Sequence, residues 1–143
     1  MSDARAATVP LVDETGATSK VAEIFADIKA TKNIDFVPHF WRVLATNPAQ
    51  LEMVWTSLKR LMHPEAAGAE SHLDARTREI IAIAVSATNG CNYCINSHTT
   101  AALTLGLSRA ALGEVLAIAG LFNMTNTLAD GYQIEPDVRP PLE

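Results

Sequence analysis

The sequence predicts an all-α protein, and three observations support this prediction. Segments that alternate apolar and polar residues, as half-buried strands do, are nearly absent. Ala and Leu dominate the composition, and apolar residues recur at helical spacing. Residues that start or end helices recur along the chain, among them Asn47-Pro48, Asp74, Asn89-Gly90 and Ser108. We therefore expect a helical bundle.

The first half of the chain is expected to hold three helices. The first runs from about Ser19 to Thr31, with apolar residues three and four apart, and Pro38 opens a short second one. The third begins at Asn47-Pro48, where Asn is a cap, Pro occupies the first turn and Gln50 stands like the far half of a capping box. Residues 63–73 are rich in Ala, Gly, Glu and Pro, and we expect a loop there.

The second half is expected to hold three further helices. Asp74 caps the first, whose apolar residues lie almost all round it and so predict a central position. Asn89-Gly90 ends this helix, because either residue tolerates the left-handed conformation. Cys91 opens the next helix, which ends at Gly106. Ser108 then caps the last long helix, and the tail over residues 134–143, with its three prolines, is expected to be extended.

Length, composition and charge indicate one globular domain over residues 1–143, with its core motif at about 74–119. A chain of 143 residues can bury a core, and 48% hydrophobic with 19% charged residues is a globular composition. The net charge of −5, without a dense Lys/Arg cluster, argues against a nucleic-acid partner. The opening residues 1–10 lack the pattern of a secretory signal, so we expect a cytoplasmic protein.

Two stretches of the chain carry no Asp, Glu, Lys or Arg. The first, Ile80 to Ser108, is interrupted by polar and turn-forming residues at Thr88–Asn92, so we expect no membrane span. The second, Val115 to Ala129, is too short to span a bilayer. Uncharged helices that stay in water must be covered, and so short a chain cannot cover both. The two stretches therefore predict a homo-oligomer.

The only two cysteines, Cys91 and Cys94, stand with His98 at positions i, i+3 and i+7. At roughly 100° per residue, the three fall within about 60° of one another on one helix face. Cysteines three apart in a first helical turn can close a disulfide with little backbone change. The helix start favours a thiolate, and His98 can hydrogen-bond Cys94 or take its proton. Dithiol chemistry needs a stabilised thiolate, a nearby base and a second thiol, and this helix face provides all three.

Glu79 lies on the preceding helix, twelve residues before Cys91. If the Asn89-Gly90 turn folds the two helices against each other, this carboxylate lies near the dithiol and forms the outer member of a proton relay. A solvated Glu79 paired with Arg76 or Arg78 is the structural alternative.

These residues carry a family resemblance. The run from Arg78 to Val85, then Asn89-Gly90-Cys91-Asn92-Tyr93-Cys94, then His98, resembles the core of the alkylhydroperoxidase AhpD-like family of the carboxymuconolactone decarboxylase superfamily. The pattern of that family is a Glu, a step of twelve residues to CxxC, and a His four residues beyond the second Cys. The resemblance is specific over about Asp74–Ala119 and weaker over the first half.

The resemblance implies an all-α AhpD-like bundle, with the CxxC at the start of a central helix, that assembles as trimers or hexamers. It implies a peroxidase with antioxidant activity and no cofactor, in which Cys94, paired with His98, attacks a hydroperoxide and becomes a sulfenic acid. Cys91 then resolves it as a disulfide, and a thiol or a lipoyl-type partner protein supplies electrons. Helix-end electrostatics instead favour Cys91 as the more acidic thiol. The best-known members have His where this chain has Tyr93, which argues against a full relay.

Other functions stay open at this stage. A zinc site could use Cys91, Cys94 and His98, with His72 or His39 as a fourth ligand, but the second Cys/His pair of zinc motifs is missing. A lactone decarboxylase-like enzyme of the superfamily would not need the dithiol. A redox-sensing oligomer would show thiol oxidation without turnover. Haem attachment is excluded, because His does not follow the CxxC directly. Three aromatic residues are expected in the core or at a subunit interface: Phe40, Trp41 and Trp55.

Overall fold

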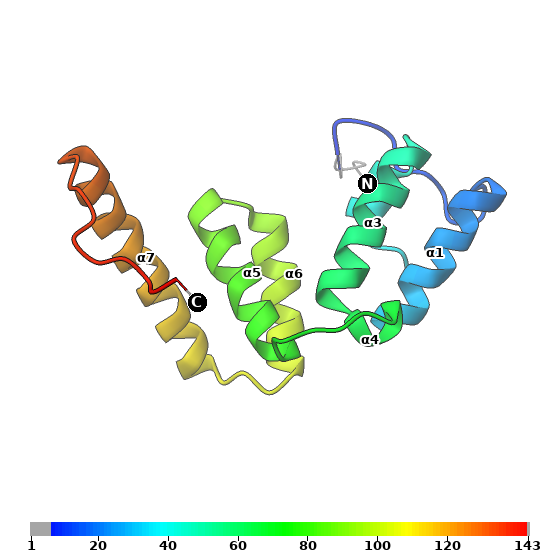
Figure 1. Ribbon diagram of the computed structural model, residues 1–143. Coiled ribbons are helices and arrows are strands. Elements are labelled where there is room, and N and C mark those ends of the chain that lie inside the picture. Colours follow the sequence, from blue (N-terminus) through cyan, green and yellow to red (C-terminus); the bar gives the residue numbers. More distant parts are fainter. Residues whose placement is uncertain (1–6, 143) are drawn as a thin grey trace. The chain divides into compact units, whose positions relative to one another are not determined.

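The computed structural model describes residues 7–142, and all of their regular structure is helical, which confirms the expected fold class (Figure 1). The helices are α1 (Ser19–Lys32), α2 (His39–Leu44), α3 (Pro48–Met62), α4 (Pro64–Ala67), α5 (Ala75–Asn89), α6 (Asn92–Thr104) and α7 (Arg109–Gly131). The chain divides into two compact units, Met1–His72 and Leu73–Glu143. A single domain over residues 1–143 stays a prediction. Within the described residues, no helix is long and apolar enough to cross a membrane.

The first unit packs α1, α2 and α3 around aromatic side chains. Trp41 of α2 and Trp55 of α3 are buried and meet edge to face, with ring centroids 5.1 Å apart, so both belong to the core as expected. Phe40 contacts the edge of Trp41 but is itself exposed. The other buried residues of this core are Val21, Phe25, Ile28, Val37, Ala45 and Leu51.

A polar group fastens α1 to α3 at the side of this core. The Trp55 indole N–H donates to Asp27 Oδ2 at 2.7 Å, and Lys59 Nζ lies 2.8 and 2.9 Å from the two carboxylate oxygens. Burial raises the pKa of Asp27, but the hydrogen bonds from Lys59 and Trp55 outweigh it and hold that pKa below its usual range. Asp27 is therefore a stabilising carboxylate of this unit, which the sequence did not single out.

The expected loop over residues 63–73 is wrong at its beginning, where α4 forms a short helix. Pro64 occupies the first helical position, since its fixed φ suits a helix and its missing N–H costs nothing there. Gly68 ends α4 in the left-handed region, with φ 62°. The expected start of α3 is confirmed, because the Asn47 side chain accepts the Gln50 N–H at 3.3 Å.

In the second unit α5 packs against both α6 and α7 (Figure 1). Ile83 of α5 and Ala102 of α6 are fully buried between these helices. The expected caps are confirmed: Asp74 accepts the Thr77 N–H at 2.8 Å, and Ser108 accepts the Ala111 N–H at 3.0 Å. α5 and α6 run antiparallel on either side of a sharp turn. The expected end of α5 at Asn89-Gly90 is confirmed, because Gly90 follows the last helical residue with a φ of 72°.

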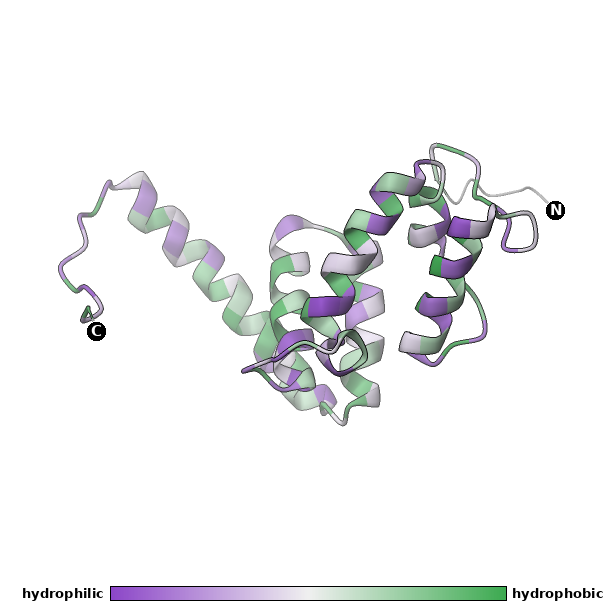
Figure 2. Ribbon diagram, turned by 45° about the vertical axis from the view of Figure 1, so that its right-hand side comes forward, coloured by the Kyte–Doolittle hydropathy of each residue, from purple (hydrophilic) through white to green (hydrophobic). Residues whose placement is uncertain are grey.

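Helix α7 exposes most of its apolar side chains. None of its residues is buried, although Val115–Ala129 carries no charged side chain (Figure 2). α5, expected to be central, also has an exposed apolar edge at Ile81 and Val85. A groove of about 450 Å³ lies between the two helices. The large exposed hydrophobic residues of α7 are Leu116, Ile118, Leu121, Phe122, Met124 and Leu128.

Candidate redox site

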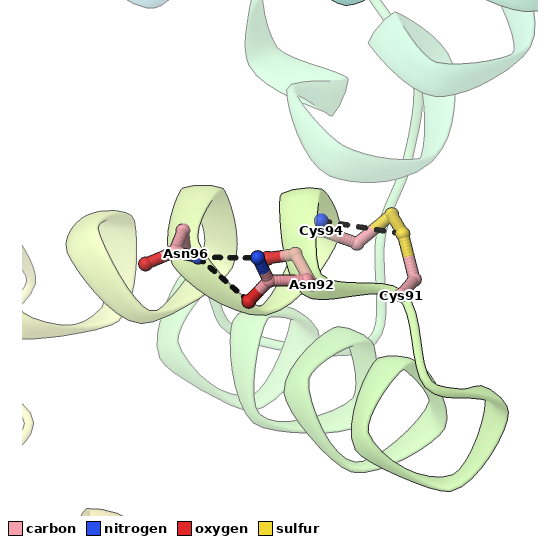
Figure 3. The surroundings of a disulfide bond; sticks show 4 residues. All are labelled: Cys91, Asn92, Cys94 and Asn96. Carbon is pink, nitrogen blue, oxygen red and sulfur yellow. Dashed lines mark hydrogen bonds between the residues drawn. A yellow bond between two sulfur atoms is a disulfide. The ribbon is translucent and has the colours of Figure 1, made fainter.

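A disulfide stands at the start of α6. Cys91 and Cys94 are joined by an S–S bond of 2.09 Å, with their Cα atoms 5.3 Å apart (Figure 3). Cys91 is the N-cap residue of α6, and the backbone N–H of Cys94 donates to its Sγ at 3.3 Å (Figure 3). The sulfur thus takes the place of the oxygen that Ser or Asp provides at other caps.

This position has an electrostatic consequence for the reduced pair. The first N–H groups of a helix lack intrahelical partners and carry partial positive charge. A thiolate on Cys91 would accept the Cys94 N–H that already points at its sulfur. That Cys91 is the more acidic thiol stays a prediction, and the Cys94 N–H at its sulfur is the contact that supports it.

His98 and Glu79 form an ion pair or hydrogen bond between α6 and α5. Nδ1 of His98 lies 2.7 Å from Oε2 of Glu79. The Glu79 carboxylate can only accept, so Nδ1 carries the proton of this bond. Glu79 is buried and His98 is half-buried, so solvent screens the contact only partly. Since this bond engages Nδ1, Nε2 is the imidazole nitrogen that could exchange a proton with another group.

Cys94 and His98 share one face of α6. They lie one helical turn apart. Side chains on a helix lean toward its N-terminus, which for His98 is the direction of the turn that holds Cys94. An imidazole one helical turn from a thiol can accept its proton, and a carboxylate bonded to Nδ1 can orient the imidazole for this.

The alternative of a solvated Glu79 does not agree with its burial, since the residue is 8% exposed. Arg76 Nη2 donates to the Leu105 carbonyl at 3.2 Å, and Arg78 Nη1 donates to the Leu73 carbonyl. Both guanidinium groups thus donate to backbone carbonyls, and the Glu79 carboxylate contacts His98. The sequence placed Glu79 near the dithiol, but its direct bond to His98 appears only in the structure.

The outward side of α6 near the disulfide is neutral. Tyr93, between the two cysteines, is 47% exposed. Asn96 Nδ2 donates to the backbone oxygen of Asn92 at 2.9 Å and to its side-chain oxygen at 3.2 Å (Figure 3). A partner that approaches the disulfide from this side therefore meets amide and phenol groups rather than formal charges.

The residues named in the zinc alternative are not gathered into one site. Within residues 7–142, no three His, Cys, Asp or Glu side chains are grouped so that they could hold a metal ion. Both His39 and His72 are exposed, and the two cysteines are bonded to each other.

Sequence reasoning missed one buried polar residue beside the site. Ser86 of α5 is 8% exposed, and its carbonyl accepts the Cys91 N–H at 3.0 Å. In the sequence it is one small residue in an apolar helix. Its position seven residues after Glu79, and hence on the same face of α5, is the signal that could have found it.

Comparison with known proteins places this site in a family. The model of the carboxymuconolactone decarboxylase family matches residues 57–134. The crystal structure of the alkylhydroperoxidase AhpD core from Rhodospirillum rubrum is similar over 92% of this chain and 95% of that one, with a TM-score of 0.82 and 44% sequence identity.

Curated relatives are more distant. Alkyl hydroperoxide reductase AhpD from Anaeromyxobacter sp. is 31% identical over 128 residues, 86% of this chain and 58% of that protein. (R)-2-haloacid dehalogenase from Pseudomonas putida is 28% identical over 112 residues, 78% of this chain and 35% of that protein. The chain thus spans between about a third and three fifths of the length of these two relatives. The family match and the AhpD-core fold together show that the chain belongs to the carboxymuconolactone decarboxylase family, as an AhpD-like member.

Proposed function

We propose that this protein is a thiol-dependent peroxidase that reduces organic hydroperoxides through the Cys91–Cys94 pair. Membership of an AhpD-like family with a CxxC disulfide supports a redox enzyme of this kind. The single observation that carries the proposal is the bond between Glu79 and His98, one helical turn from Cys94. A buried carboxylate that orients an imidazole beside a thiol is a device for proton transfer, which a merely structural disulfide does not need.

The oxidative half begins with the reduced pair. His98 accepts the proton of the Cys94 thiol, and the thiolate attacks the terminal oxygen of the hydroperoxide. An S–O bond forms, the O–O bond breaks, and the alkoxide leaves as an alcohol with the proton that His98 holds. Cys94 is now a sulfenic acid. The Cys91 sulfur attacks it, the S–S bond forms as the S–O bond breaks, and the hydroxyl leaves as water with the proton of the Cys91 thiol.

The reductive half returns two electrons to the disulfide. A dithiol, such as a lipoyl group on a partner protein, attacks one sulfur of the pair, and the other leaves as a thiolate. The second thiol of the donor then displaces the enzyme sulfur, and the donor leaves as a cyclic disulfide. The more stabilised thiolate is the better leaving group, which favours release of Cys91 at the start of α6.

Assembly and compartment belong to the same proposal. The exposed apolar side chains of α7 and the edge of α5 support a homo-oligomer, for which we propose the trimer or hexamer that the family resemblance implies. Regeneration of a dithiol needs a reducing compartment, so we place the reaction in the cytoplasm.

A peroxide-consumption assay with two cysteine variants tests the proposal. Purified protein is mixed with cumene hydroperoxide and a dithiol, and alcohol formation is followed. The wild type should turn over many times. Cys91→Ser should turn over more slowly than the wild type, because only the added dithiol can resolve its sulfenic acid, and Cys94→Ser should consume none.

The assay also separates the alternatives. Equal rates in the wild type and in Cys94→Ser would overturn the proposed function. A wild-type protein that is oxidised once and does not turn over with the dithiol would do the same and would support a redox-sensing protein instead.

A further inference from the structure

The groove between α5 and α7 is apolar over most of its length. Its volume of about 450 Å³ lies in the range of small-molecule sites in proteins. The two helices pack against each other and run in the same direction (Figure 1), so residues early in both helices line the same part of it. In this part the lining is formed by Ile80 and Ala84 of α5 and by Val115 and Ala119 of α7.

The other end of the groove is polar. It is lined by Thr88 and Asn89 of α5 and by Asn123 and Asn126 of α7, and the Thr88 hydroxyl donates to Asn123 Oδ1 at 3.1 Å. Amide groups both donate and accept hydrogen bonds, as a hydroperoxide or an alcohol group does. Among the described residues that line the groove, none carries a formal charge, so a charged ligand would find no partner there. The lining therefore suits a neutral ligand with an apolar body and one polar end.

This polar end lies next to the turn that leads to the disulfide. Asn89 is the last residue of α5 and comes two residues before Cys91, so their Cα atoms can be at most about 7 Å apart. The Cα atom of Cys94 lies 5.3 Å from that of Cys91. Between groove and disulfide, a methyl group placed on Gly90 would meet no atom beyond its chain neighbours within 4 Å. The turn is therefore open at this position.

We propose that the α5–α7 groove binds the apolar chain of an uncharged organic hydroperoxide, with the peroxide group at the end next to Cys91. The inference rests on the proposed function, because it names the class of substrate that the cysteine pair reduces. From Ile80 to Thr88 the groove is about 12 Å long, since eight helical residues rise roughly 1.5 Å each. An extended octyl chain is of similar length, whereas a tert-butyl group fills only a part.

A second copy of the chain is the other candidate occupant, but α7 offers it a different side. At about 100° per residue, the exposed apolar residues that do not line the groove lie on the opposite side of the helix. Phe122 lines the groove but is 55% exposed, so a second copy can contact it as well. The residues on the opposite side are Leu116, Leu121, Met124 and Leu128.

Binding is tested with 1-octanol, the alcohol that 1-octyl hydroperoxide would give. It does not react with the disulfide, so the oxidised full-length protein can be titrated without redox chemistry. In two-dimensional NMR of isotope-labelled protein, 1-octanol should shift the methyl resonances of Ala84 and Ala119 to saturation and leave those of the first unit in place. Ala119→Phe should weaken this binding about tenfold or more, because the ring takes the place of several methylene groups.

Substrate preference gives a second readout. In the wild type, kcat/KM should be higher for 1-octyl hydroperoxide than for tert-butyl hydroperoxide, since only the longer chain fills the groove. Ala119→Phe should lower the ratio of these two values about tenfold. A general defect in the chemistry of the cysteine pair would instead lower both values together and leave their ratio unchanged.

A matched control places the same ring elsewhere on α7. Ala117 is exposed and does not line the groove in the described structure, so Ala117→Phe should bind 1-octanol and keep the wild-type ratio. Far-ultraviolet circular dichroism confirms that each variant is folded. If Ala119→Phe does not fold, Ala84→Leu narrows the same groove from the side of α5.

The outcomes are distinct. Absence of shifts at the groove with 1-octanol, or a ratio in Ala119→Phe within twofold of wild type, would overturn the proposal. A lower mass of Ala119→Phe in analytical ultracentrifugation, without binding of 1-octanol to the wild type, would overturn it in favour of a second copy in the groove. If no hydroperoxide is turned over while 1-octanol still binds at the groove, the proposed function fails and the ligand site stands.

Discussion

Nδ1 of His98 lies 2.7 Å from Oε2 of Glu79, and this bond joins the two helices that flank the disulfide. It engages Nδ1 of the imidazole, and Nε2 is the nitrogen that we propose for proton exchange with Cys94, which lies on the same face of α6. The bond thus connects the packing of α5 against α6 with the proposed chemistry of the thiol, and the first two predictions address its two ends.

His98→Ala should slow the reaction of reduced Cys94 with a hydroperoxide on the order of tenfold to a thousandfold, since a positioned base is lost. Stopped-flow measurement of thiol oxidation at neutral pH gives the rate constant directly. His72→Ala, which removes an exposed histidine outside the site, should react like the wild type. A wild-type rate in His98→Ala would exclude His98 as the base.

Glu79→Gln should slow the same step on the order of tenfold, because a neutral amide orients the imidazole less well than a carboxylate and can present an N–H to Nδ1. If Glu79 acts through His98, the double variant should be no slower than His98→Ala alone. Independent, multiplicative effects would instead show that Glu79 has a separate role. Glu70→Gln, at an exposed position, is the matched control.

Asp27→Asn should destabilise the first unit by about 1–2 kcal/mol at pH 7, a figure kept small because the carboxylate is partly exposed to screening solvent. The pKa of Asp27 is lower in the folded state than in the unfolded state. The stabilising effect of the carboxylate is therefore present above the pKa of the unfolded state and is lost as the pH falls through the pKa of the folded state. Urea unfolding at several pH values should show the difference from wild type shrink below about pH 4. Asp35→Asn, on the surface, should show no such difference.

Phe122→Glu should shift the protein toward smaller species in analytical ultracentrifugation. A charge placed among the exposed apolar side chains of α7 would be buried without a partner if a second copy covers this face. Gln50→Glu adds the same charge in the first turn of α3 and should leave the assembly unchanged. An unchanged mass for Phe122→Glu would show that α7 is not covered at Phe122.

Local signals in the sequence predicted much of the fold. Asn47, Asp74 and Ser108 cap helices as expected, since capping depends on a side chain and an N–H only three residues away. The helix at Pro64 was missed, because Ala, Glu and Pro suit both a loop and one helical turn and no apolar periodicity marks so short an element.

Contacts between distant residues were harder to predict. Cys91 caps α6, and Cys94 and His98 lie within it. Their shared face therefore followed from helix geometry alone. The partners of Asp27 lie 28 and 32 residues away, and nothing in the sequence pairs them. The direct bond of Glu79 to His98, and the burial of Ser86 at the level of Cys91, depend on the register between α5 and α6, which the turn at Gly90 sets.

The sulfur that caps α6 links backbone order to the oxidation state of the protein. The amide proton of Cys94 is held by Cys91 Sγ, so its exchange with solvent deuterium reports how firmly that sulfur sits over the first turn. Protection factors at this one amide, compared before and after addition of a reductant, therefore follow the redox cycle from the backbone, without a label on either thiol.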